Sequence, residues 1–478
     1  MTTNLLFITT DQQRWDSLPC YGLDFMQTPN LDRLAREGLV FERCIVPGAV
    51  CVPCRAAIMT GQYPSTTGVL NNGSWLRPET PTWPARLTAA GRRTAAIGKM
   101  HFYPWDTLGG FAERIIAEDK RHVYLPDDHV QFLRQQGLER PHPTTDPGYF
   151  ESLGAPIKPW PKHLHIDAFV GDQAAMWLER NGHAPFAVWV SFPGPHDPYD
   201  PPQELATMYD DAPIPAPIGA PAELINKPPA QRSRGAGTLN NAMFQIDPSQ
   251  ATPEQYRRWR AHYYANISLI DEGIGKILAA LERVDALDKT LIIFTSDHGD
   301  ALGDHGLAYK GFFYDSMVHV PLILRGPGVP VGQRCASLVS TLDLIPLFFQ
   351  TCGVEPPSTV QGEDIGVLLR DPNATLRQAA FCELTGRAMV QTDGYKYARY
   401  ADGSAELYDL HRDPAEIQNL AGKPDQLAVE QGMQALLLNH WLTNQRQQAA
   451  AMEVPQHPLR MAIEEEYRQR RTQSALRS

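Results

Sequence analysis

The sequence has no long hydrophobic run, no internal repeat and no low-complexity segment. No apolar stretch reaches the ~18 residues that a membrane span requires. The opening Met1-Thr2-Thr3-Asn4 brings no basic leader to the short apolar run that follows it. Glycine and proline are spread along the chain without a period, which excludes collagen-like and repeat proteins. We therefore expect a globular enzyme-like protein in the cytoplasm, with no membrane partner.

The sequence also has fewer basic than acidic residues, and it has few cysteines. Aspartate and glutamate number 54 against 43 lysines and arginines, which gives a net charge of −11. A field of this sign repels nucleic acids and anionic membranes, so we expect no nucleic-acid partner. An anionic substrate would have to be attracted by local cations. Seven cysteines in 478 residues do not imply a framework of disulfides.

Short apolar runs alternate with helical patterns along most of the chain. This alternation is typical of an α/β fold in which helices cover both faces of a parallel sheet. We expect a large, mostly parallel sheet sandwiched by helices in residues 1–375. The predicted strands are residues 5–10, 94–97, 186–192, 291–296 and 320–324. The predicted helices run from Thr28-Pro29 to Gly38 and over residues 166–180, 253–283 and 341–352.

The pattern changes in two places. Residues 198–252 are rich in Pro, Ala, Gln and Asn, and we interpret them as an irregular insertion that shapes a substrate pocket. From about Phe381, short alternating strands predict a small antiparallel sheet followed by a helix over 424–445, together an α+β subdomain at 376–450. The charged tail, 451–478, has two open interpretations: disorder, or contact with a second copy of the chain in a homo-oligomer.

The most informative segment is residues 51–61, which read Cys-Val-Pro-Cys-Arg and end in Thr-Gly. A helix beginning near Cys54 would point its backbone N–H groups at a bound anion. Cys51 and Cys54 could instead be a redox pair or zinc ligands, but neither a thioredoxin-like context nor two further ligands at zinc-site spacing is evident. The segment resembles the signature of the type I, formylglycine-dependent sulfatases of the alkaline phosphatase superfamily.

Acidic residues follow two of the predicted strands. Asp11-Gln12 follows the first strand, and Asp297-His298 follows a later one. Because ligands collect at the carboxyl ends of parallel strands, these groups can converge although they are far apart in the sequence. Taken singly, an aspartate after a strand is more often a turn or cap residue.

The resemblance assigns these residues to a metal site. In the family the cysteine, here Cys51, is oxidised to formylglycine by a formylglycine-generating enzyme, and its hydrated aldehyde is a geminal diol. One divalent cation would then be bound by Asp11, Gln12, Asp297, His298 and an oxygen of modified Cys51. Gln12 replaces the commoner aspartate and His298 the commoner asparagine. A set with fewer carboxylates favours Mn²⁺ or Mg²⁺, while Ca²⁺ stays open.

Cationic residues occur in the order that the family uses. Lys99 and His101 follow the strand 94–97, His196 follows the strand 186–192, and Lys310 comes soon after Asp297. Each alone is ordinarily just a solvated side chain. Asn72 and Asn71 are equal candidates for a residue that faces the site, and the alternative is that the pair forms a simple turn.

The resemblance gives these residues roles. Arg55, Lys99 and Lys310 would supply positive charge, with Arg55 mainly holding the nucleophile segment. His196 would protonate the departing oxygen, and His101 would take a proton from the second hydroxyl of the diol to release sulfate. The residues implied to contact substrate are Asn72, Lys99, His196 and Lys310.

The implied function is hydrolysis of a sulfate monoester, a small anionic ester. A phosphonate monoester or phosphodiester hydrolase on the same scaffold is the alternative, because that arylsulfatase-like branch also resembles this chain in pairing Gln12 with His298. A two-metal phosphatase would need a Ser or Thr nucleophile and more metal ligands. A non-catalytic protein of this fold would have no need of the whole set of catalytic residue types. The alcohol half of the ester is not indicated.

Overall fold

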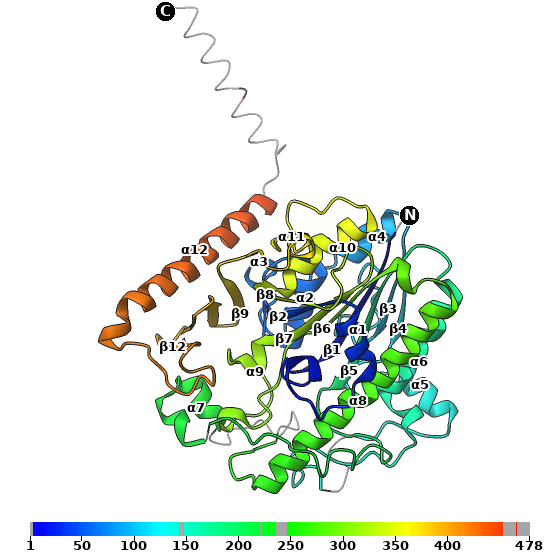
Figure 1. Cartoon of the computed structure of the whole chain (residues 1–478), viewed down its shortest axis with the longest axis horizontal. Coiled ribbons are helices and arrows are strands. Elements are labelled where there is room, and N and C mark those ends of the chain that lie inside the picture. Colours follow the sequence, from blue (N-terminus) through cyan, green and yellow to red (C-terminus); the bar gives the residue numbers. More distant parts are fainter. Residues whose placement is uncertain are drawn as a thin grey trace, which may run out of the picture.

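The computed structural model describes residues 3–142, 145, 148–219, 221–235, 246–452 and 465. It contains an eight-stranded sheet in the order β4-β3-β5-β1-β6-β7-β2-β8 (Figure 1). Its strands are β1 (Asn4–Asp11), β2 (Leu39–Ile45), β3 (Arg93–Gly98), β4 (Glu113–Ile116), β5 (Phe186–Pro195), β6 (Thr290–Ser296), β7 (His319–Arg325) and β8 (Gln333–Ser340). The expected α/β class with a large, mostly parallel sheet is confirmed.

Five neighbouring strands, from β4 to β6, run parallel, and β1 lies between β5 and β6, near the middle of the eight-stranded sheet. β7 runs antiparallel to both β6 and β2, so the expectation that residues 320–324 belong to the parallel part of the sheet was wrong. A parallel return requires a long crossover, usually a full helix. Between β6 and β7 the chain forms only two short helical turns, η7 (Asp304–Gly306) and α9 (Asp315–Val318).

Side chains of β1 alternate between two hydrophobic cores, one on each face of the sheet. Leu5 and Phe7 pack into one core, and Leu6 and Ile8 into the other. The first core is completed by α2 (Cys51–Thr60), α4 (Trp83–Ala89) and α10 (Leu344–Cys352). The second is completed by α1 (Pro29–Arg36), α6 (Ile166–Asn181) and α8 (Pro253–Arg283). This is the helix–sheet–helix sandwich that the continuous apolar runs predict.

Several helix boundaries differ from the prediction. α8 spans the predicted residues and begins at a capping box formed by Thr252 and Gln255. α1 ends two residues before Gly38, and α10 is preceded by the separate 3₁₀ turn η8 (Thr341–Asp343). The insertion is not wholly irregular, because it contains η4 (Pro221–Asn226) and α7 (Pro229–Gly235); residues 220 and 236–245 lie outside the described part.

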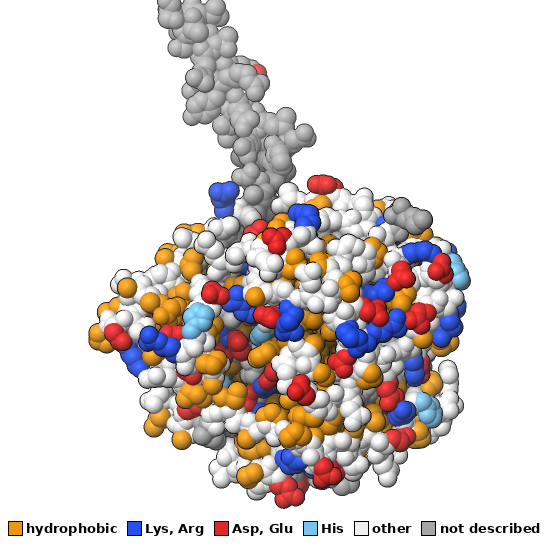
Figure 2. Space-filling model, in the orientation of Figure 1, with side chains coloured by type: hydrophobic (Ala, Val, Ile, Leu, Met, Phe, Trp, Pro, Cys, Tyr) orange, Lys and Arg blue, Asp and Glu red, His pale blue; other side chains and the backbone are white. Residues whose placement is uncertain are grey.

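Further short helical segments lie in the connections. They are α3 (Pro64–Thr67), α5 (Asp128–Gln135), α11 (Gly366–Arg370), η1 (Pro19–Tyr21), η3 (Lys162–Leu164), η6 (Leu287–Lys289) and η9 (Pro424–Gln426). Among the described residues, no helix is both long enough and apolar enough to cross a bilayer. On the face seen in Figure 2, acidic and basic side chains are interspersed and form no stripe of one sign.

The C-terminal part forms the expected small antiparallel sheet. Its order is β12-β11-β10-β9, and its strands are β9 (Ala380–Leu384), β10 (Arg387–Gln391), β11 (Tyr395–Tyr400) and β12 (Ala405–Asp409). α12 (Leu427–Met452) lies beside this sheet and is longer than the helix predicted for 424–445 (Figure 1). The domain boundary at 375/376 stays a prediction, and the tail lies almost entirely outside the described residues.

Trp189 in β5 offers a test of the core. Its side chain is fully buried, its ring lies 5.3 Å from that of Phe7, and its Nε1 donates to Thr9 Oγ1 at 2.8 Å. We expect Trp189→Ala to lower the free energy of unfolding by about 3–5 kcal/mol, because it leaves a cavity and an unpaired hydroxyl. Urea unfolding measures this. Trp441→Ala is the matched control, since that side chain is 40% exposed, and equal losses in both variants would contradict the packing.

Candidate active site

Cys51 is the first residue of α2, so the helix begins three residues earlier than the sequence predicted from Cys54. Its side chain is fully buried. Asn72 Oδ1 accepts a hydrogen bond from Val52 N at 3.0 Å and so satisfies one of the free N–H groups of the first turn. Asn71 instead donates to Thr385 Oγ1. Of the two asparagines, the structure places Asn72 beside Cys51, and its contact with substrate stays a prediction.

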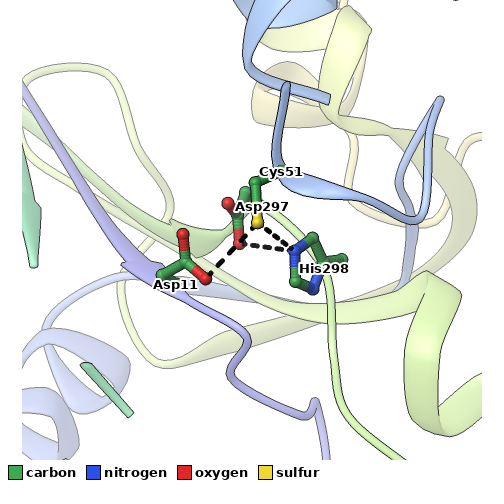
Figure 3. Close-up of side chains that lie close together, drawn as sticks. All are labelled: Asp11, Cys51, Asp297 and His298. Atoms are coloured by element: carbon green, nitrogen blue, oxygen red, sulfur yellow. Dashed lines mark hydrogen bonds and ion pairs between the residues drawn. The ribbon is translucent and has the colours of Figure 1, made fainter. Parts of the chain in front are cut away.

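Four potential metal-binding side chains meet at Cys51. The ligand atoms of Asp11, Cys51, Asp297 and His298 all lie within 4.8 Å of one another, and all four residues are buried. Figure 3 shows the two carboxylates and the imidazole directed at the cysteine sulfur. The sulfur lies 3.2 Å from His298 Nε2 and 3.8 Å from Asp11 Oδ1. The cluster forms because β1 and β6 are adjacent and parallel, so their carboxyl ends coincide.

The donor atoms fit a divalent cation. His298 Nδ1 lies 2.9 Å from the carbonyl oxygen of Gly299, which can only accept, so Nδ1 carries the proton and Nε2 presents its lone pair to the cluster. Burial, together with the charge of Asp11, raises the pKa of Asp297. A cation between the two carboxylates would remove this repulsion. Oxygen and imidazole donors of this kind suit Mn²⁺, Mg²⁺ and similar ions.

Gln12 lies at the edge of this cluster. Its backbone N donates to Asp297 Oδ1 at 3.0 Å, and its φ of 71° places a non-glycine residue in the left-handed region. Its Oε1 accepts a hydrogen bond from Lys310 Nζ. The structure therefore brings both Gln12 and Lys310 to the site, as the sequence predicted, while Gln12 as a metal ligand stays a prediction.

Arg55 holds the two carboxylates in place. Its Nε donates to Asp297 Oδ2 at 2.9 Å and its Nη2 to Asp11 Oδ2 at 3.0 Å. Its Nη1 donates to the backbone oxygen of Lys99 at 2.6 Å. Burial lowers the pKa of Arg55, but Asp297 and Asp11 outweigh it, so the pKa is raised and the guanidinium stays charged. Arg55 thus positions the carboxylates more directly than it positions the cysteine.

Lys99 reaches the cluster from the end of β3. Its Nζ lies 2.9 Å from Asp11 Oδ2 and 3.1 Å from Asp119 Oδ2. Burial lowers the pKa of Lys99, but these two carboxylates raise it above the ordinary value. The preceding Gly98 has a φ of 99°, and a Cβ there would lie 2.0 Å from the backbone oxygen of Ser191. Only glycine fits this close approach, which explains the residue before Lys99.

Both predicted histidines border the cluster. His196 Nε2 lies 4.0 Å from Asp11 Oδ1, and its Nδ1 lies 2.7 Å from the backbone oxygen of Asp197. His101 is only partly buried and has a φ of 59°. Its backbone N donates to the Glu118 carboxylate at 3.1 Å. The backbone of His101 is therefore anchored to Glu118 in this strained conformation.

The electrostatic field at position 51 is positive. Burial raises the pKa of the Cys51 thiol, but nearby positive charges, those of Lys310 and Lys99 first, bring the pKa well below its ordinary value. Arg121, at the edge of the site, adds to this field. Negative charge on the side chain at this position, or on a group bound to it, is therefore stabilised.

Asp119 and Arg121 belong to the site although the sequence did not single them out. Arg121 Nη2 lies 2.9 Å from Asp119 Oδ2 and 3.2 Å from His196 Nε2. Its Nη1 lies 3.4 Å from Asp197 Oδ2. Both residues follow β4, a strand of only four residues that begins with two charged ones and therefore gave no apolar signal. The charged run after that strand is the one feature that could have indicated them.

Comparison with known proteins identifies the same chemistry. The family model described as Sulfatase matches residues 3–354, and that described as N-sulphoglucosamine sulphohydrolase, C-terminal, matches residues 303–443. A choline-sulfatase of Rhizobium meliloti is 32% identical, over 89% of this chain and 84% of that protein. An arylsulfatase of Clostridium perfringens is 29% identical, over 88% and 90% respectively.

The fold agrees with these relatives. The crystal structure of a phosphonate monoester hydrolase of Agrobacterium radiobacter has a TM-score of 0.80 to this chain at 27% identity, covering 92% of this chain and 96% of that one. The Sulfatase model covers well over half of the chain. Together with the buried cluster at Cys51, these matches show that the chain belongs to the sulfatase family of the alkaline phosphatase superfamily and is a hydrolase of sulfuric esters.

Proposed function

We propose that the enzyme cleaves its sulfate ester at Cys51 after a formylglycine-generating enzyme has converted this residue to formylglycine. The observation that carries the proposal is the convergence of two carboxylates and an imidazole on the side chain of residue 51. Hydrated formylglycine supplies one hydroxyl as nucleophile and a second whose deprotonation releases sulfate without a further attack on sulfur. An unmodified thiol could act as a nucleophile, but it has no second hydroxyl through which sulfate could be released.

We propose that one divalent cation is held by Asp11, Asp297, His298 and Gln12. When bound, the cation supplies positive charge that lowers the pKa of a hydroxyl beside it and neutralises the sulfuryl oxygens. The donor set, with an imidazole and a neutral amide beside two carboxylates, favours Mn²⁺ or Mg²⁺ over Ca²⁺.

The other residues then have distinct tasks. Lys99 and Lys310, whose charges already act on position 51, would bind the sulfuryl oxygens. His196 would deliver a proton to the departing alcohol, a contribution of about 10²–10⁴-fold. Arg121 adds a third cation next to His196. His101 would take the proton whose removal frees sulfate and restores the aldehyde.

A phosphonate monoester or phosphodiester hydrolase is the second candidate. Two observations favour it: the pairing of Gln12 with His298, and the fold similarity to the Agrobacterium radiobacter enzyme. Both substrate types carry a single negative charge, so the charge of the site does not separate them. Comparing kcat/KM for 4-nitrophenyl sulfate and 4-nitrophenyl phenylphosphonate does, and a clear preference for the phosphonate would replace the sulfatase assignment.

Mass spectrometry of the active enzyme tests the modification directly. Trypsin releases residues 44–55, which contain Cys44, Cys51 and Cys54. After alkylation with iodoacetamide, we expect two labelled cysteines and an aldehyde at position 51, which lowers the mass and takes up no label. The same peptide from Cys51→Ala is the control and should also carry two labels. Three labelled cysteines in fully active enzyme would exclude formylglycine.

A further inference from the structure

The side-chain amide of Gln12 is bonded at both ends. Its Nε2 donates to Asp300 Oδ2 at 2.5 Å, and its Oε1 accepts from Lys310 Nζ. The backbone of Gln12 is held as well, since its N donates to Asp297 and its carbonyl oxygen accepts from Tyr263 OH at 2.8 Å. A non-glycine residue keeps a left-handed conformation only where its surroundings enforce it, as these four contacts do.

The two amide contacts fix which end of Gln12 faces which neighbour. A carboxylate can only accept hydrogen bonds, and an ammonium group can only donate them. If the amide were turned over, Oε1 would oppose Asp300 Oδ2 and Nε2 would oppose Lys310 Nζ. Both contacts would then be repulsive. The amide therefore has one allowed orientation, with its oxygen on the side of Lys310.

Gln12 lies against the metal cluster, since it follows Asp11 in the chain and its backbone N donates to Asp297 Oδ1 at 3.0 Å. Because the NH₂ group of Gln12 is bonded to Asp300, Oε1 is the end of the amide that can act as a donor to a cation.

Asp300 is itself tightly held. It is fully buried, its Oδ2 accepts from Tyr199 OH at 2.7 Å, and its Oδ1 accepts from Leu302 N at 3.0 Å. Within the described ranges its side chain has hydrogen-bond donors but no Lys, Arg or His within ion-pair distance. A buried carboxylate without a countercharge is expensive unless it is fully hydrogen-bonded. The Gln12 amide provides one of the three hydrogen bonds that stabilise it.

We propose that Asp300, supported by Tyr199, is a positioning residue that presents Gln12 Oε1 to the metal cluster as a neutral oxygen donor. The inference rests on the proposed function, since it assumes that Gln12 is a metal ligand. This positioning role also explains why residue 12 carries an amide. The carboxylate of Asp300 lies next to this amide but is not one of the proposed metal ligands. A carboxylate at position 12 would face that of Asp300 and be repelled by it.

The affinity for Mn²⁺ tests this without any reading of activity. Isothermal titration of Mn²⁺ into chelator-treated enzyme gives the Kd. We expect Asp300→Asn to weaken binding by about 10–100-fold, as loss of a group that orients a metal ligand typically does. An asparagine at 300 offers a donor as well as an acceptor, so Lys310 alone then favours the original orientation of the Gln12 amide. Tyr199→Phe removes the hydrogen bond to Asp300 and also an acceptor 3.3 Å from Gln12 Nε2, and it should weaken binding by about 2–10-fold.

A paired substitution separates positioning from a general structural effect. In Gln12→Glu with Asp300→Asn, the carboxylate and the amide exchange places, and residue 12 presents an oxygen in either orientation. We expect this double variant to bind Mn²⁺ more tightly than Asp300→Asn alone. Asp271→Asn, the same change at a buried carboxylate on α8, is the matched control and should keep the wild-type Kd.

The possible outcomes distinguish failure of the positioning role from failure of the proposed metal site. Wild-type affinity in both Asp300→Asn and Tyr199→Phe, or a double variant no tighter than Asp300→Asn, would overturn the positioning role. Should Asp300→Asn fail to fold by circular dichroism, Tyr199→Phe decides alone, and an unchanged Kd there sinks the inference. Absence of Mn²⁺ binding to the wild-type protein would instead count against the proposed metal site.

Discussion

Cys51→Ala is expected to abolish turnover of 4-nitrophenyl sulfate, with a loss of roughly 10⁶-fold in kcat, the scale seen when a hydrolase loses its nucleophile. The alanine has no atom that can be sulfated, while the proposed substrate-binding residues Lys99, Lys310 and His196 are unchanged. The fold should survive, because the change removes a single atom at the start of a helix whose other residues stay packed.

Cys54→Ala is the matched control for this prediction. Cys54 is an equally buried cysteine of the same helix, and burial raises the pKa of its thiol well above the ordinary value, which favours the neutral thiol. We expect that variant to keep most of its activity. Unimpaired hydrolysis by Cys51→Ala, measured by release of 4-nitrophenol, would remove the nucleophile assignment.

Removal of divalent metal is expected to have the second-largest effect. After chelation and desalting, turnover should fall to background and return on addition of Mn²⁺, because Asp11 and Asp297 lose the charge that they are arranged to bind. Stability should change as well. At a free metal concentration a hundred times the Kd, binding adds about 2.7 kcal/mol to the free energy of unfolding.

Urea unfolding with and without Mn²⁺ measures that shift. Asp297→Asn, which removes one carboxylate, should unfold at the same urea concentration in both conditions. Full activity in an enzyme whose metal content is shown to be nil by elemental analysis would contradict the metal site. A shift of equal size in Asp297→Asn would mean that Mn²⁺ binds elsewhere on the protein.

The sequence predicts best the strands that are buried on both faces. β1 opens with a continuous apolar run because both faces of the central strand are covered. β2 was missed because Glu42 and Arg43 interrupt its apolar residues, and both side chains are partly exposed. The antiparallel direction of β7 was also beyond prediction, since a strand's own residues do not record its direction.

The residues of the site also fall into those that the sequence predicts and those that it does not. Residues in a contiguous motif or at the end of an apolar strand, such as Cys51, Asp297 and Lys99, could be found from the sequence, and the structure brings them together. Asp119 and Asp300 were not singled out, because the role of each depends on a partner elsewhere in the chain: Lys99, 20 residues away, for the first and Gln12, 288 residues away, for the second. Burial and hydrogen bonding define the roles of these carboxylates, and neither can be inferred from the neighbouring residues in the sequence.

The position of β1 between β5 and β6 has a consequence for protein synthesis. A nascent chain that has reached residue 285 already contains the cysteine, Arg55, Lys99 and His196, yet it holds only one of the two carboxylates that meet at β1 and β6. Capture of the ion must therefore wait until β6 has emerged from the ribosome and paired with the first strand made. An ion bound at the proposed site thus marks a molecule whose first strand and β6 have paired.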